Sequence, residues 1–351
     1  MTPWEINSIS IRTVTENQIS DSLYANGLMQ VPVHVLIKAR YKNKSERYRL
    51  GPQDLKLVKL FDFVDKEKEM PQGWTYTDVE NDYHHSLSSL RADSTGAASA
   101  VQSASYDNEP DVKTFWVSTT KVETKEIAAS ITPPGEKLSS TDDDKNHSHV
   151  ILNGKIPRRY TTDDIIVQKE EILNGHYKLE WTGQFGLIWH ESWPKYWQTN
   201  HYVTLKGGMP LKKVKLHDHN PDGNYKEPKY KGLANTFAYW ASDNHNMRIY
   251  YIWEYGKETS KDVGITRDVT IWNAGLQVPR KAHAEKTIRV NQKPNSVCMT
   301  VMYYSCNDAL WGNQWYNDKA GFEIYDVFGN TWRFKVTFET DHVIVRDENV
   351  E

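Results

Sequence analysis

A two-residue alternation of apolar and polar side chains is the feature that most constrains this fold. It is clearest in residues 31–41, where every odd position is apolar and most even positions are polar. Successive strand residues point to opposite faces of a sheet, so this pattern predicts a strand with one buried face. The same alternation runs through residues 263–271 and 332–338. Faces of this kind become buried when two sheets pack on one another.

Other segments agree with a fold built from strands. Residues 299–304 are apolar on both faces, which is typical of a central strand, and residues 249–255 are rich in aromatics. The best helical segment is residues 52–58, where Pro52 starts one or two turns. Many short strands separated by turn signals, without alternating helices, favour β-sandwiches over an α/β fold.

A chain of 351 residues exceeds the usual size of one domain. We therefore predict an all-β protein of two β-sandwich domains. Residues 1–175 form the first, which is immunoglobulin-like in character, and residues 176–351 form an aromatic-rich second domain. Residues 86–110 are rich in Ser and Ala and poor in apolar side chains. They are predicted to be a mobile loop of the first domain.

The charge and the cysteines narrow the class of protein. A net charge of −3 argues against nucleic acid as a partner. Six lysines crowd residues 212–231 and are interpreted as a solvated strand edge, with contact to a phosphate backbone or an anionic headgroup as the alternative. The two cysteines, Cys298 and Cys306, share one strand-like run, and eight strand steps separate them by roughly 26 Å, beyond disulfide reach.

The beginning of the sequence lacks the basic and apolar regions of a secretory signal, and no apolar run reaches the length of a membrane span. Synthesis in the cytoplasm is therefore predicted, with release or secretion by a leaderless route as the alternative.

None of the common catalytic motifs occurs, including Gly-x-Ser-x-Gly, His-Glu-x-x-His and the phosphate-binding glycine loops. We predict a non-enzymatic binding protein. A glycoside-cleaving enzyme remains an alternative, because it needs only two suitably spaced carboxylates that no short motif reveals. A self-assembling structural protein, forming a homo-oligomer through aromatic contacts, is a further alternative.

Residues 217–224 are the one compact segment rich in metal-ligand side chains. Asp218, Asn220 and Asp222 alternate as in the opening of a calcium loop, and Gly223 permits the sharp turn. The match to a calcium loop ends there, because the position of the bidentate Glu is occupied by Lys229. His217 and His219 could offer two imidazoles to zinc, but the sequence assigns no third ligand. An ordinary turn is favoured, so no cofactor is required, although calcium here would fit a lectin.

Ten of the thirteen tryptophans lie in residues 181–332. Two groups, in residues 189–197 and 311–316, fall in stretches marked by Gly, Asn and Pro, which are typical of loops. The tryptophans of strand-like runs, Trp240, Trp253, Trp272 and Trp332, are predicted to lie in the core. The predicted binding residues are those of the two loops: Trp189, Trp193, Tyr196, Trp197, Trp311, Asn313, Trp315 and Tyr316.

The second group lies in residues 297–317, where an apolar strand leads through a Tyr- and Asn-containing turn into a Trp-rich loop. This segment resembles the membrane-docking loop of actinoporin-type cytolysins. The resemblance implies that Trp311, Trp315 and Tyr316 contact lipid headgroups, and indole rings do favour the bilayer interface. The predicted partner is thus a membrane surface or a glycan, as expected of a toxin, a lectin or an adhesin.

Overall fold

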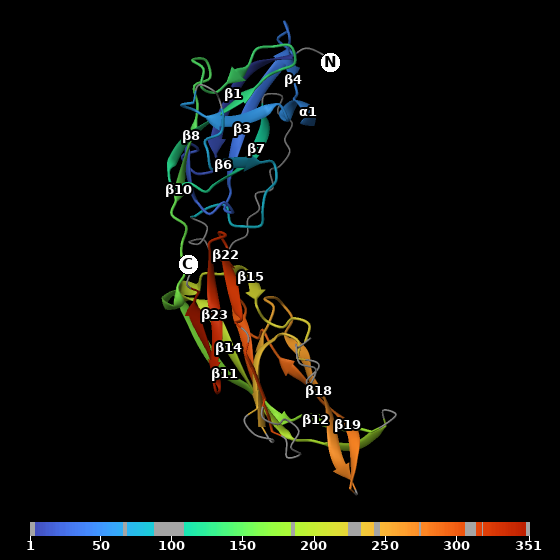
Figure 1. Ribbon diagram of the computed structural model, residues 1–351. Coiled ribbons are helices and arrows are strands. Elements are labelled where there is room, and N and C mark those ends of the chain that lie inside the picture. The colour runs from blue at the N-terminus through green and yellow to red at the C-terminus, as the bar shows by residue number, and fades with distance from the viewer. Residues whose placement is uncertain are drawn as a thin grey trace. The chain divides into compact units, whose positions relative to one another are not determined.

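The computed structural model describes residues 4–65, 69–87, 109–183, 187–223, 233–241, 246–273, 275–305, 314–317 and 319–348 (Figure 1). The side chains of residues 189–190, 241, 269, 271–273 and 314–317 are outside this description. The predicted mobile loop falls largely outside it as well, since residues 88–108 are not described. The described chain is almost entirely strand, which confirms the predicted all-β, sandwich-type fold.

The chain divides into two compact units, one of Met1–Arg158 with Val327–Asn330 and one of Arg159–Asp326 with Thr331–Glu351. The division lies earlier than the predicted boundary after residue 175. Residue 175 lies within strand β11 (Ile165–His176), which pairs at both of its ends with β14 (Lys195–Leu205) of the second unit.

Two five-stranded sheets are formed by the part of the first unit that the structure describes. One has the order β1-β3-β7-β6, with β4 beside β3: β1 (Trp4–Thr13), β3 (Val31–Tyr41), β4 (Arg47–Tyr48), β6 (Trp74–Thr77) and β7 (Asp111–Thr119). The other has the order β2-β10-β8-β5, with β9 beside β8: β2 (Ser20–Tyr24), β5 (Val58–Asp62), β8 (Thr124–Ile131), β9 (Ser139–Ser140) and β10 (Val150–Lys155).

Two sequence predictions are confirmed in this unit. Strand β3 has the predicted bounds and buries Val31, Val33, Val35 and Ile37 completely, so its alternation does mark a core face. The predicted helix is the single turn α1 (Pro52–Leu55), in which Pro occupies an early position. No helix among the described residues is long and apolar enough to cross a membrane.

The described residues of the second unit form three sheets. The largest has the order β11-β14-β20-β17-β16-β21 and is called here the central sheet. Its further strands are β16 (Thr236–Ala241), β17 (Asn246–Ile252), β20 (Val297–Ser305) and β21 (Gln314–Asn317). A four-stranded sheet has the order β13-β12-β19-β18: β12 (Lys178–Thr182), β13 (Ile188–Ser192), β18 (Ser260–Asn273) and β19 (Leu276–Arg289). Figure 1 shows β18 and β19 side by side as one long hairpin.

The third sheet has the order β15-β22-β23-β24 and is called the covering sheet. Its strands are β15 (Leu211–His217), β22 (Gly321–Asp326), β23 (Thr331–Glu339) and β24 (His342–Asp347). Two short 3-10 turns, Thr162–Asp164 and Lys206–Gly208, complete the described helical elements of this unit.

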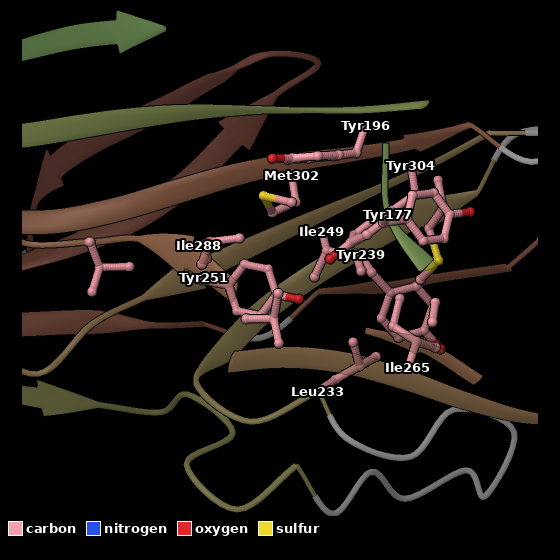
Figure 2. Packing of buried hydrophobic residues seen from close by; sticks show 14 of the residues in the cluster. Tyr177, Tyr196, Leu233, Tyr239, Ile249, Tyr251, Ile265, Ile288, Met302 and Tyr304 are labelled. Atoms are coloured by element: carbon pink, nitrogen blue, oxygen red, sulfur yellow. The ribbon is translucent and has the colours of Figure 1, made fainter. Parts of the chain in front are cut away.

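The central sheet is buried on both faces over much of its length. One face packs with β12, β18 and β19 around a tyrosine-rich core, in which the rings of Tyr177 and Tyr304 meet edge to face with centroids 5.0 Å apart (Figure 2). The other face packs on the covering sheet through residues such as Tyr250, Phe322 and Phe334. Strand β20 is accordingly buried on both faces, as its continuous apolar run predicts.

Candidate functional site

The first predicted aromatic loop, residues 189–197, is two strands joined by a short turn. Trp189 lies in β13, and its side chain is outside the described set. Trp193 lies in the turn and is 58% exposed. Strand β14 begins after Pro194, so the loop prediction was wrong: proline occupies the connection, where its missing N–H costs no ladder hydrogen bond.

Alternation along β14 separates its two aromatic residues. Tyr196 is 3% exposed and belongs to the tyrosine-rich core, where burial raises the pKa of its hydroxyl. Trp197 points to the other face of the central sheet and is 38% exposed. Of the predicted loop aromatics whose side chains are described, Trp193 and Trp197 can therefore meet a partner, and Tyr196 cannot.

Trp197 begins a row of residues that crosses the central sheet. Its backbone pairs with Tyr303 of β20, Tyr303 pairs with Arg248 of β17, and Arg248 pairs with Trp240 of β16. Residues that are opposite in register share a face of the sheet. Trp240 was predicted to lie in the core but is 38% exposed. That prediction was wrong because the row lies where the covering sheet ends, at its β23–β24 turn, which Arg248 reaches through Asp341.

The second predicted aromatic loop continues the same row. Trp311 and Asn313 lie outside the described residues. Trp315 and Tyr316 lie in strand β21 rather than in a loop, and the backbone of Trp315 pairs with that of Trp240. Each of the two aromatic groups thus contributes a residue to the same cross-strand row of the central sheet. Trp197 and Trp315 are four strand spacings, or roughly 19 Å, apart in that row.

Three side chains of this row form a column, called here the aromatic stack: Trp197, Tyr303 and Arg248. The rings of Trp197 and Tyr303 are nearly parallel, at 14°, with centroids 3.5 Å apart. The guanidinium of Arg248 lies 5.1 Å from the centroid of the Tyr303 ring, within cation–π range.

Hydrogen bonds fix two members of the stack, Arg248 and Tyr303. Arg248 Nε donates to Asp341 Oδ1 at 2.8 Å, and the Tyr303 hydroxyl donates to Asn246 Oδ1. Side chains that are packed and hydrogen-bonded on regular strands lose little conformational entropy when they bind a partner. The stack is therefore a preorganised surface.

The free face of the Trp197 indole is directed toward β11. Tyr303 covers the face on the β20 side, and β11 flanks β14 on the opposite side. A depression of about 550 Å³ lies there, called here the indole depression. A β-bulge in β11, between Glu171 and Leu173, interrupts the strand pairing at this point. The depression is lined by Glu171, Ile172, Leu173, Asn174, Trp197, Gln198 and Thr199.

The lining combines one aromatic ring with polar groups. Asn174 lies opposite Trp197 in register and is exposed, as is Glu171. A carboxylate accepts hydrogen bonds and an amide both donates and accepts them. Sequence reasoning missed Glu171, Asn174, Arg248 and Tyr303. One signal was available, because Arg248 is the only charged residue in the buried, aromatic strand β17.

The predicted calcium residues lie in a turn after β15. Asp218 has a positive φ of 50°, and Asn220 exchanges backbone hydrogen bonds with the segment that begins β16. Asp222 precedes Gly223, where the described part of this segment ends. No group of three or more His, Cys, Asp or Glu side chains is placed to hold a metal within the described residues. Calcium binding at Asp218, Asn220 and Asp222 stays a prediction.

No protein-family model matches this chain, and a search of curated proteins found no match either. Function is therefore inferred from the aromatic stack and the indole depression themselves.

Proposed function

We propose that this chain is a non-enzymatic glycan-binding protein, similar to a lectin in its action, that holds a sugar ring in the indole depression. The apolar face of a pyranose carries C–H groups that pack on the π-face of an aromatic ring. Trp197 offers such a face, 38% exposed and fixed from behind by Tyr303. A rigid indole contributes a large contact area at a low cost in side-chain entropy.

Polar groups at the rim of the depression suit the hydroxyls of a sugar. Asn174 lies across the strand pair from Trp197, and Glu171 stands at the bulge. A sugar hydroxyl can donate to the Glu171 carboxylate and both donate to and accept from the Asn174 amide. Hydrogen bonds to a charged acceptor are the stronger ones, so Glu171 contributes both affinity and orientation.

The observation that favours a neutral glycan over an anionic lipid headgroup is that Glu171 lines the same depression as Trp197. A phosphate held against Trp197 would meet a like charge, which opposes binding. A neutral hydroxylated ring meets a hydrogen-bond acceptor in the same place. The depression therefore suits a neutral sugar better than the anionic surface of a membrane.

Isothermal titration calorimetry with the neutral oligosaccharide that binds best on a glycan array tests the proposal. Trp197→Ala removes the stacking face, and loss of about 1.4 kcal/mol corresponds to a tenfold weaker Kd. Trp193→Ala is the matched control, because it removes an exposed indole from the turn outside the row. We expect at least a tenfold loss for Trp197→Ala and less than about a twofold change for the control.

Other outcomes would contradict the proposal. Equal losses of affinity for the two variants would show that any exposed indole contributes to binding, whether or not it lines the indole depression. Binding of phospholipid vesicles by the wild-type chain, with no binding of any neutral glycan, would favour the membrane-active alternative. Glu171→Gln keeps a hydrogen-bond acceptor while removing the charge, so it should weaken glycan binding less than Trp197→Ala does.

A further inference from the structure

In the hydrophobic cores of the second unit formed by the described residues, only one face of the covering sheet takes part. Its inner positions, among them Phe322, Ile324, Phe334 and Val336, pack on the central sheet. Strand residues alternate between faces, so Glu323, Tyr325 and the residues beside them lie on the outer face. This outer face belongs to a different sheet from the aromatic stack, and the inference drawn from it is independent of glycan binding at Trp197.

The outer face gathers basic side chains from three strands, and we call it the cationic face. Cross-strand register aligns them on either side of β22: Lys215 pairs with Glu323, which pairs with Arg333, and Gly321 lies between His217 and Lys335. Lys335 in turn pairs with Arg346. The basic members are Lys213, Lys215 and His217 of β15, Arg333 and Lys335 of β23, and Arg346 of β24.

Glu323 is the acidic group at the centre of this face. Its carboxylate lies 3.6 Å from Lys215 Nζ, 3.9 Å from His217 Nε2 and 3.7 Å from Arg333 Nε. It also accepts a hydrogen bond of 2.9 Å from the Tyr325 hydroxyl. Because its side chain is only 10% exposed, Glu323 is covered by its basic neighbours and cannot oppose an approaching anion as a free surface charge would.

The basic groups exceed the acidic ones on this face. Five lysines and arginines occupy outer positions of the four strands, against the two carboxylates Glu323 and Glu339. Glu339 lies at the far end, opposite His342, and adding Glu348 beyond β24 still leaves an excess of positive charge. In the described part of the chain no ion-pair partner is found for the exposed residues Lys213, Lys335 and Arg346.

The arrangement of these charges is linear. The side chains at the outer positions of β22 do not project above those of the neighbouring strands, since Gly321 has no side chain and Tyr325 is buried beneath Lys213 and Lys215. Strands β15 and β23 flank β22, so their basic rows are two strand spacings, or roughly 9.6 Å, apart. A chain of anionic groups lying along β22 would meet cations on both sides.

We propose that the cationic face binds a linear sulfated polysaccharide along β22. Sulfate groups carry a permanent negative charge that complements lysine and arginine, and a linear polymer that presents them in series can contact both rows of cations. A membrane would be anchored by exposed Trp or Tyr, whereas Tyr325, the aromatic residue at these outer positions, is buried. The same burial removes the stacking surface that single-stranded nucleic acids use.

The test uses a sulfated heparin dodecasaccharide and the full chain. The variant Lys213→Gln, Lys335→Gln, Arg346→Gln removes three cations that hold no ion pair in the described structure, so folding should be preserved. The control variant Lys59→Gln, Lys155→Gln, Lys281→Gln removes the same charge from exposed positions elsewhere. We expect the first variant to bind at least tenfold more weakly than the wild type. The slope of its log K against the logarithm of the salt concentration should be smaller in magnitude by about two. The control should retain wild-type affinity within about twofold.

Three results would overturn the proposal. Equal losses for both triple variants would mean that only net charge matters. Equal affinity for an unsulfated dodecasaccharide of the same backbone would show that the sulfate groups are not recognised. Binding to phosphatidylserine vesicles without binding to the sulfated dodecasaccharide would assign the face to a membrane. Trp197→Ala should leave binding of the sulfated dodecasaccharide unchanged, so failure of the two proposals can be told apart.

Discussion

A buried histidine should make the stability of the second unit depend on pH. His201 of β14 is almost completely buried between the central and covering sheets. Its Nε2 accepts a hydrogen bond of 3.4 Å from the backbone N–H of Val343, and Nδ1 has no partner among the described residues. Burial, reinforced by the nearby charges of Lys169 and His342, lowers the pKa of His201 from 6.5 to about 4.

The sign and size of the effect follow from this shift. Well above pH 6.5, His201 is neutral in both the folded and the unfolded chain and contributes no pH dependence. As the pH falls from 6.5 toward 4, the unfolded chain takes up a proton that the folded chain refuses, so the free energy of unfolding decreases. The difference between a pKa of 6.5 and one of about 4 corresponds to about 3 kcal/mol, a large part of a typical stability of 5–15 kcal/mol.

Urea unfolding at a series of pH values measures this directly, with His201→Gln as the comparison. Glutamine keeps an acceptor for the Val343 N–H and does not titrate between pH 4 and 7. The stability difference between wild type and His201→Gln should therefore change by about 3 kcal/mol across that range, with the wild type losing more on acidification. The reasoning fails if the two curves stay parallel. His342→Gln should retain most of the dependence, because burial is the larger cause.

Three other predictions concern residues of the second unit. Burial raises the pKa of the Cys298 thiol to about 12, so iodoacetamide at pH 8 should label it only after denaturation, as peptide mass spectrometry would show. Asn200→Ala deprives the buried Thr300 hydroxyl of its 2.7 Å acceptor and should reduce the free energy of unfolding by about 3 kcal/mol, and no change in the urea midpoint would refute this. Gly321→Ala would place a Cβ 2.6 Å from the Phe334 carbonyl oxygen and should lower stability by about 2 kcal/mol in thermal unfolding, with an unchanged Tm as the contrary result.

The strands were predictable from the sequence because their signal is local. The alternation over residues 31–41 gives β3 with its observed bounds, and the doubly apolar run at 299–304 identifies β20 as a central strand. Both patterns show which face of a single strand each successive side chain occupies, and this depends only on neighbouring residues. Loops were harder to assign: Pro194 was interpreted as loop chemistry for all of residues 189–197, although it affects only the connection between β13 and β14.

The site could be predicted only in part, because cross-strand register is not local. Trp197 was predicted to be a binding residue, but its contact with Tyr303 depends on the pairing of β14 with β20. Trp240 was assigned to the core since it lies in a strand, yet its exposure depends on where a different sheet ends. In the same way, the lysine-rich segment at 212–231 was visible in the sequence, and only sheet pairing adds Arg333 and its neighbours to it.

The central claim is that a sugar ring lies against Trp197, and the indole N–H resonances of the tryptophans test it most directly. Substitution of Trp197 and of Trp193 by Phe assigns the two signals, and the array-selected neutral oligosaccharide is then titrated into the wild-type chain. The account predicts a saturable shift of the Trp197 signal, with the exposed Trp193 and the buried Trp253 unchanged. A titration that shifts Trp193 and leaves Trp197 unmoved would contradict it.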